Sequence, residues 1–243
     1  HWPEVMVSYD EADGVLFSAD AFGRFGLPGD PGDWADEARR YYINIVGKYG
    51  SSVQTLLKKL SGLPVKIICP LHGPVLTGDL SGYLEKYDIW SSYRPEERGV
   101  LIAYASIYGN TASAALRLRD MLARRGEKRV AAVDLARSDI SRAVADAFRY
   151  DALVLAAPSY DGAVLPPMAA FLSRLKAKNW QKRTAAVIEN GSWAPSAGKV
   201  MLAALAEMKD VAVLEPMVSI RSAVSEETAT KLNELADALA ARG

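Results

Sequence analysis

Hydroxyl and amide side chains follow directly after a buried apolar run near the middle of the chain. Residues 100–105 are uniformly apolar, which predicts a strand buried on both faces, as in the centre of a parallel sheet. A short turn then opens a helix whose Ala115, Leu118 and Leu122 share one face. Helix N-termini present free N–H groups and the positive end of the helix dipole. We therefore expect a phosphate-binding site formed by Ser106, Ile107, Tyr108, Gly109, Asn110 and Thr111.

The composition of this turn narrows the class of ligand. It lacks the Gly-Lys pattern of a P-loop and the three-glycine pattern of a dinucleotide site, so ATP and NAD are poor candidates. Neutral hydroxyls and an amide in place of a lysine suit a phosphate monoester, which points to FMN. A simpler interpretation, in which Ser106 or Asn110 merely caps the helix, accounts better for this stretch when it is taken alone.

The remainder of the chain makes the cofactor interpretation stronger. Strands and helices alternate regularly after residue 98, which predicts an α/β fold with a doubly wound, five-stranded parallel sheet. Ligands in such sheets bind at the C-terminal ends of the strands, where the strand order reverses. The expected strands are 100–105, 130–135, 152–156, 185–188 and 211–216, and the expected helices are 110–125, 139–148, 166–176, 196–208 and 226–241.

Two further loops leave the same edge of the expected sheet. Each carries turn-forming residues and one aromatic side chain that suits a planar ring. Taken singly, Tyr160 is explained as an exposed residue of an ordinary turn, and Trp193 as a packing residue. Three such loops on one edge of the sheet, however, favour a planar phosphorylated cofactor. The candidate residues are Pro158, Ser159, Tyr160, Asp161 and Gly162 in one loop, and Asn190, Gly191, Ser192 and Trp193 in the other.

The first part of the chain has a different pattern. A hairpin is expected over residues 5–18, with the Asp20 carboxylate just after its second strand, and helices over 34–48 and 51–60. A short strand over 65–69 runs into His72, which lies between prolines on a stiff turn. This placement suits a metal ligand or a base, although a plain polar role accounts better for a lone histidine when it is taken alone. Residues 80–98 are expected to form a helix followed by a domain linker.

Composition excludes several classes of protein. The 243 residues include 29 Lys or Arg and 29 Asp or Glu, so the formal net charge is zero. The chain therefore has no net positive charge to attract nucleic acid or an anionic membrane surface. No apolar run approaches the roughly 20 residues of a membrane span. Cys69 is the single cysteine, which excludes an internal disulfide and favours a reducing, cytoplasmic location.

The order of motifs resembles the flavodiiron proteins, also called A-type flavoproteins. These motifs are His-Trp-Pro-Glu-Val-Met at 1–6, Phe-Ser-Ala-Asp-Ala-Phe-Gly at 17–23 and Cys-Pro-Leu-His-Gly-Pro at 69–74, followed by a flavodoxin-like domain. The resemblance implies a partial metallo-β-lactamase-like α+β domain over 1–97 and an FMN-binding domain over 98–243. It further implies iron ligands at His1, Asp20 and His72, with Asp20 bridging two irons.

The same resemblance implies an activity and partners. FMN would pass electrons to a non-haem diiron site that reduces O2 to water or NO to N2O. The electron donor would be a rubredoxin or a flavin reductase, and the assembly a head-to-tail homodimer or a dimer of such dimers.

One departure from the family pattern affects the metal site. The upstream His-x-Glu-x-Asp-His motif is absent, and His1 and His72 are the two histidines of the sequence. Since these ligands cannot hold two irons in the family's manner, we expect the sequence to be the C-terminal part of a longer flavodiiron protein. Otherwise the chain is an FMN-binding electron-transfer module without diiron chemistry, or an α/β scaffold without a cofactor.

Overall fold

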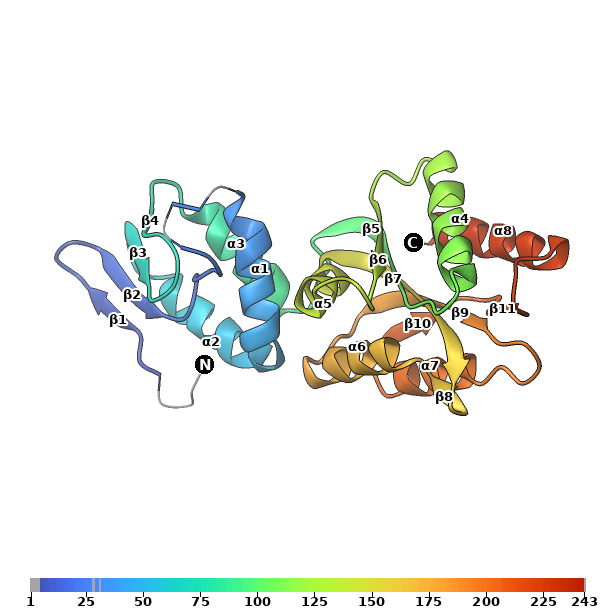
Figure 1. Ribbon diagram of the computed structural model, residues 1–243. Coiled ribbons are helices and arrows are strands. Elements are labelled where there is room, and N and C mark those ends of the chain that lie inside the picture. The colour runs from blue at the N-terminus through green and yellow to red at the C-terminus, as the bar shows by residue number, and fades with distance from the viewer. Residues whose placement is uncertain (1–4, 28, 31, 243) are drawn as a thin grey trace. The chain divides into compact units, whose positions relative to one another are not determined.

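The computed structural model describes residues 5–27, 29–30 and 32–242 and divides the chain into two compact units (Figure 1). Unit 1 ends at Glu96 and unit 2 begins at Glu97. Within the described residues, no helix is long and apolar enough to cross a bilayer. The elements of unit 1 are β1 (Ser8–Asp10), β2 (Val15–Ala19), α1 (Trp34–Ile45), the 3-10 helix η1 (Gly47–Tyr49), α2 (Gly50–Leu60), β3 (Ile67–Pro70), β4 (Leu76–Thr77) and α3 (Ser81–Ser91).

Unit 1 contains a four-stranded sheet and a core rich in aromatic side chains. Its strand order is β1-β2-β3-β4, in which β2 and β3 run parallel and the other neighbours run antiparallel. Asp33 caps α1 by accepting a hydrogen bond from the Ala35 N–H. Tyr42, Tyr87 and Trp90 are buried from α1 and α3, with ring centroids 5.1–5.5 Å apart. These rings dock the two helices on each other.

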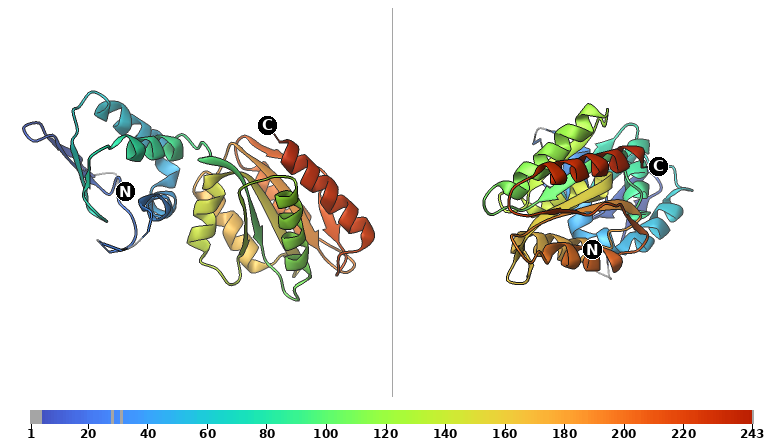
Figure 2. Two further views of the ribbon diagram at one scale, coloured as in Figure 1. Left: turned by 90° about the horizontal axis from the view of Figure 1, so that it is seen from above. Right: turned by 90° about the vertical axis from the view of Figure 1, so that its right-hand side faces the viewer.

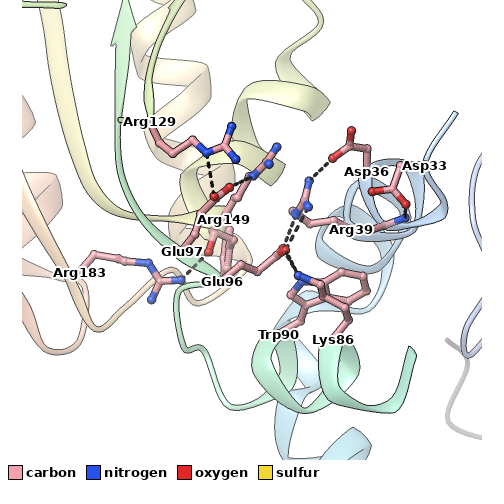
Figure 3. A network of polar contacts seen from close by, with 12 residues as sticks. Asp33, Asp36, Arg39, Lys86, Trp90, Glu96, Glu97, Arg129, Arg149 and Arg183 are labelled. Carbon is pink, nitrogen blue, oxygen red and sulfur yellow. Dashed lines mark hydrogen bonds and ion pairs between the residues drawn. The ribbon is translucent and has the colours of Figure 1, made fainter. Parts of the chain in front are cut away.

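The segment expected to be a domain linker ends unit 1 with a buried carboxylate, Glu96, that forms hydrogen bonds with side chains of that unit. Glu96 is 3% exposed in its side chain and accepts hydrogen bonds from Arg39, from Lys86 Nζ at 2.9 Å and from Trp90 Nε1 at 2.6 Å (Figure 3). Burial alone would raise the pKa of Glu96, but the hydrogen bonds and positive charge of Arg39, with those of Lys86 and Trp90, hold this pKa below its ordinary value. The last residue of unit 1 is therefore part of its core.

Unit 2 is a doubly wound parallel sheet with helices on both faces. Its central strands follow the order β9-β7-β5-β6, so the strand order reverses between β5 and β7. The fold class predicted from the sequence is confirmed. The elements are β5 (Glu97–Tyr104), α4 (Asn110–Arg124), β6 (Val130–Asp134), α5 (Ile140–Arg149), β7 (Tyr150–Tyr160), β8 (Ala163–Val164), α6 (Pro166–Ala177), β9 (Arg183–Asn190), α7 (Ala197–Ala206), β10 (Val211–Val213), β11 (Val218–Ile220) and α8 (Glu226–Ala241).

The helices of unit 2 follow the periodicity seen in the sequence. Helices α4 and α8 cover one face of the sheet, and α6 and α7 cover the opposite face (Figure 2). Ala115, Leu118 and Leu122 of α4 are completely buried, as their common face predicted, and pack with Leu232 and Leu235 of α8 in one apolar cluster. This core fixes the edge of the sheet where the candidate loops emerge.

Two elements of unit 2 differ from the prediction. The strand expected over 211–216 is interrupted: β10 and β11 both pair parallel with β9, at different positions along it. Pro216 lies in the gap, and proline has no N–H to donate to a sheet. The loop expected over 157–162 is a hairpin, in which β7 extends to Tyr160 and turns back into β8 through Asp161 and Gly162, both with positive φ.

Candidate cofactor and metal sites

A pocket of about 190 Å³ lies where the C-terminal ends of β5, β7 and β9 meet. Ten of the fifteen residues predicted to hold a cofactor line it, together with Ser222, which the sequence analysis missed. Gly109, Tyr160, Asp161, Gly162 and Trp193 are not among the lining residues. The lining is formed by Ser106, Ile107, Tyr108, Asn110, Thr111, Pro158, Ser159, Asn190, Gly191, Ser192 and Ser222.

The turn after β5, which the sequence predicts to bind a phosphate, leads directly into the N-terminus of α4. Gly109 precedes α4 with φ +88°, a left-handed conformation that glycine adopts without strain, and its N–H donates to Ser106 Oγ at 3.0 Å. The N-cap residue Gly109 has no side chain with which to cap α4, and Asn110 and Thr111 of the first turn line the pocket. The N–H groups of a first helical turn have no intrahelical acceptor. No Lys or Arg is among the lining residues. The chemistry is that of a neutral donor set for an anion.

Two polar side chains at this edge are used to fix a neighbouring helix. Ser159 Oγ accepts hydrogen bonds from the Ser196 and Ala197 N–H groups at 2.7 and 3.1 Å, and so caps α7. Glu189, for which the sequence offered no role, is buried and accepts from the Gly198 N–H at 2.8 Å and from Ser219 Oγ at 3.0 Å. A carboxylate at this position also complements the positive end of the α7 dipole.

Three aromatic side chains on the candidate loops are exposed, of which Tyr108 lines the pocket. Tyr108 is 90% exposed, Trp193 is 91% exposed and Tyr160 is 45% exposed. Exposed aromatic rings offer apolar faces on which a planar ligand can pack. The pocket is too small to hold both the tricyclic ring and the phosphate chain of a flavin nucleotide. It has the size for the phosphate chain, and the exposed aromatic side chains could pack against the tricyclic ring.

In unit 1, Asp20 and His72 come together. Asp20 follows β2 and His72 follows β3, and because these strands are parallel neighbours their C-terminal ends meet. His72 Nε2 lies 3.4 Å from Asp20 Oδ1. The Tyr41 ring lies 5.4 Å from the His72 ring, and its burial, followed by the charge and hydrogen bond of Asp20, raises the pKa of Tyr41 to about 12. The phenol therefore stays protonated at neutral pH.

Asp20 and His72 fit two ligands of a metal ion, since carboxylate and imidazole are donors that iron accepts. His1, the third predicted ligand, lies outside the described residues. Within the part of the chain that the structure describes, no three His, Cys, Asp or Glu side chains gather closely enough to hold a metal. The described residues therefore bring together two candidate ligands, and a two-iron centre requires more.

Comparison with known proteins agrees with this geometry. Residues 101–220 match the flavodoxin domain family. An anaerobic nitric oxide reductase flavorubredoxin of Aeromonas hydrophila is 26% identical over 207 residues, which are 79% of this chain and 41% of that protein. A mutant of the flavodiiron protein of Thermotoga maritima superposes with a TM-score of 0.84 at 26% identity, covering 98% of this chain and 61% of that one.

The rubredoxin:oxygen oxidoreductase of Desulfovibrio gigas has the same fold, with a TM-score of 0.91 at 23% identity over 99% of this chain and 62% of that one. The chain thus contains a flavodoxin domain in unit 2. As a whole it is similar to flavodiiron proteins, in agreement with the resemblance that the sequence motifs indicated. It spans less than half the length of the curated relatives described above and about three-fifths of the solved structures.

Proposed function

We propose that unit 2 binds FMN and that the chain acts as a flavin-dependent oxidoreductase. The single observation that carries this proposal is the pocket without charged side chains at the N-terminus of α4, where the N-cap residue is a glycine. The first-turn N–H groups and the Ser106 and Thr111 hydroxyls would donate to the phosphate. Tyr108, Tyr160 and Trp193 would contact the isoalloxazine ring, which explains why such large rings are exposed.

When bound, FMN supplies a carrier that accepts and releases one or two electrons. The chain's own residues bind and orient it. Gly109 lets the backbone approach the phosphate, and the caps that Ser159 and Glu189 place on α7 fix the third loop. Because aromatic faces replace water on the ring, they would favour the less charged forms of the flavin and so tune its potential.

The finer proposal is the activity of the flavodiiron family: reduction of O2 to water or of NO to N2O at non-haem iron. Asp20 and His72 would contribute two ligands, and His1 a third. The electron donor would be a rubredoxin or a flavin reductase, and a head-to-tail homodimer, or a dimer of such dimers, is the assembly we propose. The relatives whose names carry these activities extend well beyond the length of this chain.

A second candidate function is an FMN-binding electron-transfer module without chemistry at iron. It is favoured by one observation: the described residues bring two possible metal ligands together and no third. In this case Asp20 and His72 form a polar contact of the turn after β2, and reduced flavin passes its electrons directly to a partner protein.

The deciding experiment combines an absorption spectrum, an iron analysis and an activity assay. The purified chain is reconstituted with FMN and ferrous iron, and consumption of NO and O2 is followed with chemically reduced protein. Stoichiometric flavin with bound iron that is lost in Asp20→Asn and His72→Ala supports the flavodiiron activity. If the wild-type chain binds stoichiometric flavin but no more iron than these two variants, the electron-transfer module is the function that remains. Absence of flavin binding would remove both proposals.

A further inference from the structure

One residue that lines the pocket lies outside both the sequence motifs and the segment that matches the flavodoxin domain family. Ser222 lies in the connection between β11 and α8, two residues after the end of the matched segment at residue 220. It lines the same pocket as the turn after β5. The three loops recognised in the sequence leave β5, β7 and β9, so Ser222 adds a fourth connection to the same site.

Asn190 determines where this connection lies. Its side-chain Nδ2 donates to the Ser222 carbonyl at 2.9 Å, and its Oδ1 accepts from the Ser222 N–H at 3.1 Å. The two bonds engage both backbone groups of one residue, as a neighbouring strand would. They hold Ser222 at φ +67°, a left-handed conformation that residues with a side chain rarely adopt.

The same amide connects Ser222 to the predicted phosphate-binding turn. Asn190 Nδ2 also donates to Thr111 Oγ1 at 3.3 Å, and Thr111 lies in the first turn of α4. Asn190 is 7% exposed and Thr111 is 2% exposed. One buried side chain therefore joins the fourth connection to the helix N-terminus where the phosphate would lie.

The Ser222 hydroxyl retains hydrogen-bonding capacity. Its Oγ lies 3.2 Å from Ser192 Oγ, and either atom can donate to the other. Two hydroxyls carry two hydrogens, and their mutual bond uses one. The second hydrogen is available to a ligand oxygen at the pocket surface, where Ser222 is exposed.

We propose that Ser222 donates a hydrogen bond to the phosphate of FMN, and that Asn190 is the positioning residue that places it. The inference rests on the proposed function, because it specifies a contact within that flavin site. A phosphate is favoured over other parts of the cofactor because Asn190 ties Ser222 to the first turn of α4.

The test compares FMN with riboflavin, which lacks the phosphate. Apoprotein is titrated with each flavin, and quenching of flavin fluorescence gives Kd. Ser222→Ala should raise Kd for FMN about tenfold, the factor expected for one hydrogen bond to a charged group, and change Kd for riboflavin less than about twofold. Ser225→Ala is the matched control, because that hydroxyl lies in the same connection but caps α8 through the Thr228 N–H.

The positioning role of Asn190 is tested by a double-mutant cycle. Asn190→Ala should raise Kd for FMN by at least as much as Ser222→Ala, and adding Ser222→Ala to it should have little further effect, since the hydroxyl is already misplaced. Full additivity would overturn the positioning role. Should Asn190→Ala fail to fold, Ser222→Ala, which removes one exposed hydroxyl, still decides the contact.

The outcomes separate this inference from the function on which it rests. Wild-type protein that binds FMN, with Ser222→Ala unchanged or weakened equally for both flavins, would overturn the phosphate contact alone. Wild-type protein that binds neither flavin would overturn the proposed function and this inference together.

Discussion

Replacing Glu96 by Gln should destabilise unit 1 by about 3 kcal/mol. The substitution keeps the shape of the side chain but leaves the Arg39 guanidinium, 4% exposed, without its buried counter-charge. Removing one partner of a buried pair typically costs about 3–5 kcal/mol. We expect the lower end, because Arg39 keeps Asp36 at 3.0 Å, Lys86 is 35% exposed and can turn to water, and the amide oxygen still accepts from Trp90.

The effect should depend on pH in a defined direction. Because the pKa of Glu96 is lower in the folded state, the unfolded chain binds more protons near this pKa. The stabilisation is therefore complete above the ordinary Glu pKa of about 4.3 and is lost as the pH falls through the folded-state pKa. The difference between wild type and Glu96→Gln should be full at pH 7 and shrink steadily below about pH 4.

Urea unfolding followed by tryptophan fluorescence measures this difference, and hydrogen exchange in α3 assigns the transition to unit 1. Glu37→Gln is the matched control: it breaks a pair with Arg40 on the same helix, with both side chains about one-fifth exposed, and should cost less than about 1 kcal/mol. A Glu96→Gln effect no larger than that of Glu37→Gln, or a difference from wild type that grows as the pH falls, would refute the reasoning.

Three further outcomes follow from the geometry. Gly198→Ala should destabilise unit 2 by about 1–3 kcal/mol in thermal unfolding, because its Cβ would lie 2.7 Å from Met217 Sδ and 2.8 Å from Glu189 Oε2; an unchanged midpoint would contradict the close approach. Trp193→Ala should weaken FMN binding about tenfold while leaving the apoprotein's melting temperature unchanged, since the ring is 91% exposed; equal Kd values would argue against a ring contact. Asp20→Asn should abolish iron retention without changing Kd for FMN, and retained iron would exclude Asp20 as a ligand.

The fold of unit 2 could be predicted because its signals are local. Buried parallel strands appear as continuous apolar runs, and Ala115, Leu118 and Leu122 marked the buried face of α4 before any contact was known. The turn over residues 106–111 was predictable for the same reason, since β5, the turn and α4 are consecutive in the sequence.

What could not be predicted depends on contacts between distant segments. Ser222 looks like part of a polar turn, and its place in the pocket is set by Asn190, 32 residues earlier. Glu96 looked like a solvated linker residue because Glu is rarely buried without partners, and its partner Arg39 is 57 residues away. Asp20 and His72 lie close together because β2 pairs parallel with β3. A parallel pair has no tight turn between its strands, so the local sequence gives no signal of the pairing.

The interruption between β10 and β11 also affects how the sheet meets other molecules. An uninterrupted outer strand would offer a long row of unpaired backbone groups, on which the edge of another chain could add. Here the edge beside β9 consists of two strands of three residues each, separated by a segment that contains Pro216. Each short edge can form few intermolecular hydrogen bonds, so this side of unit 2 resists strand addition and aggregation.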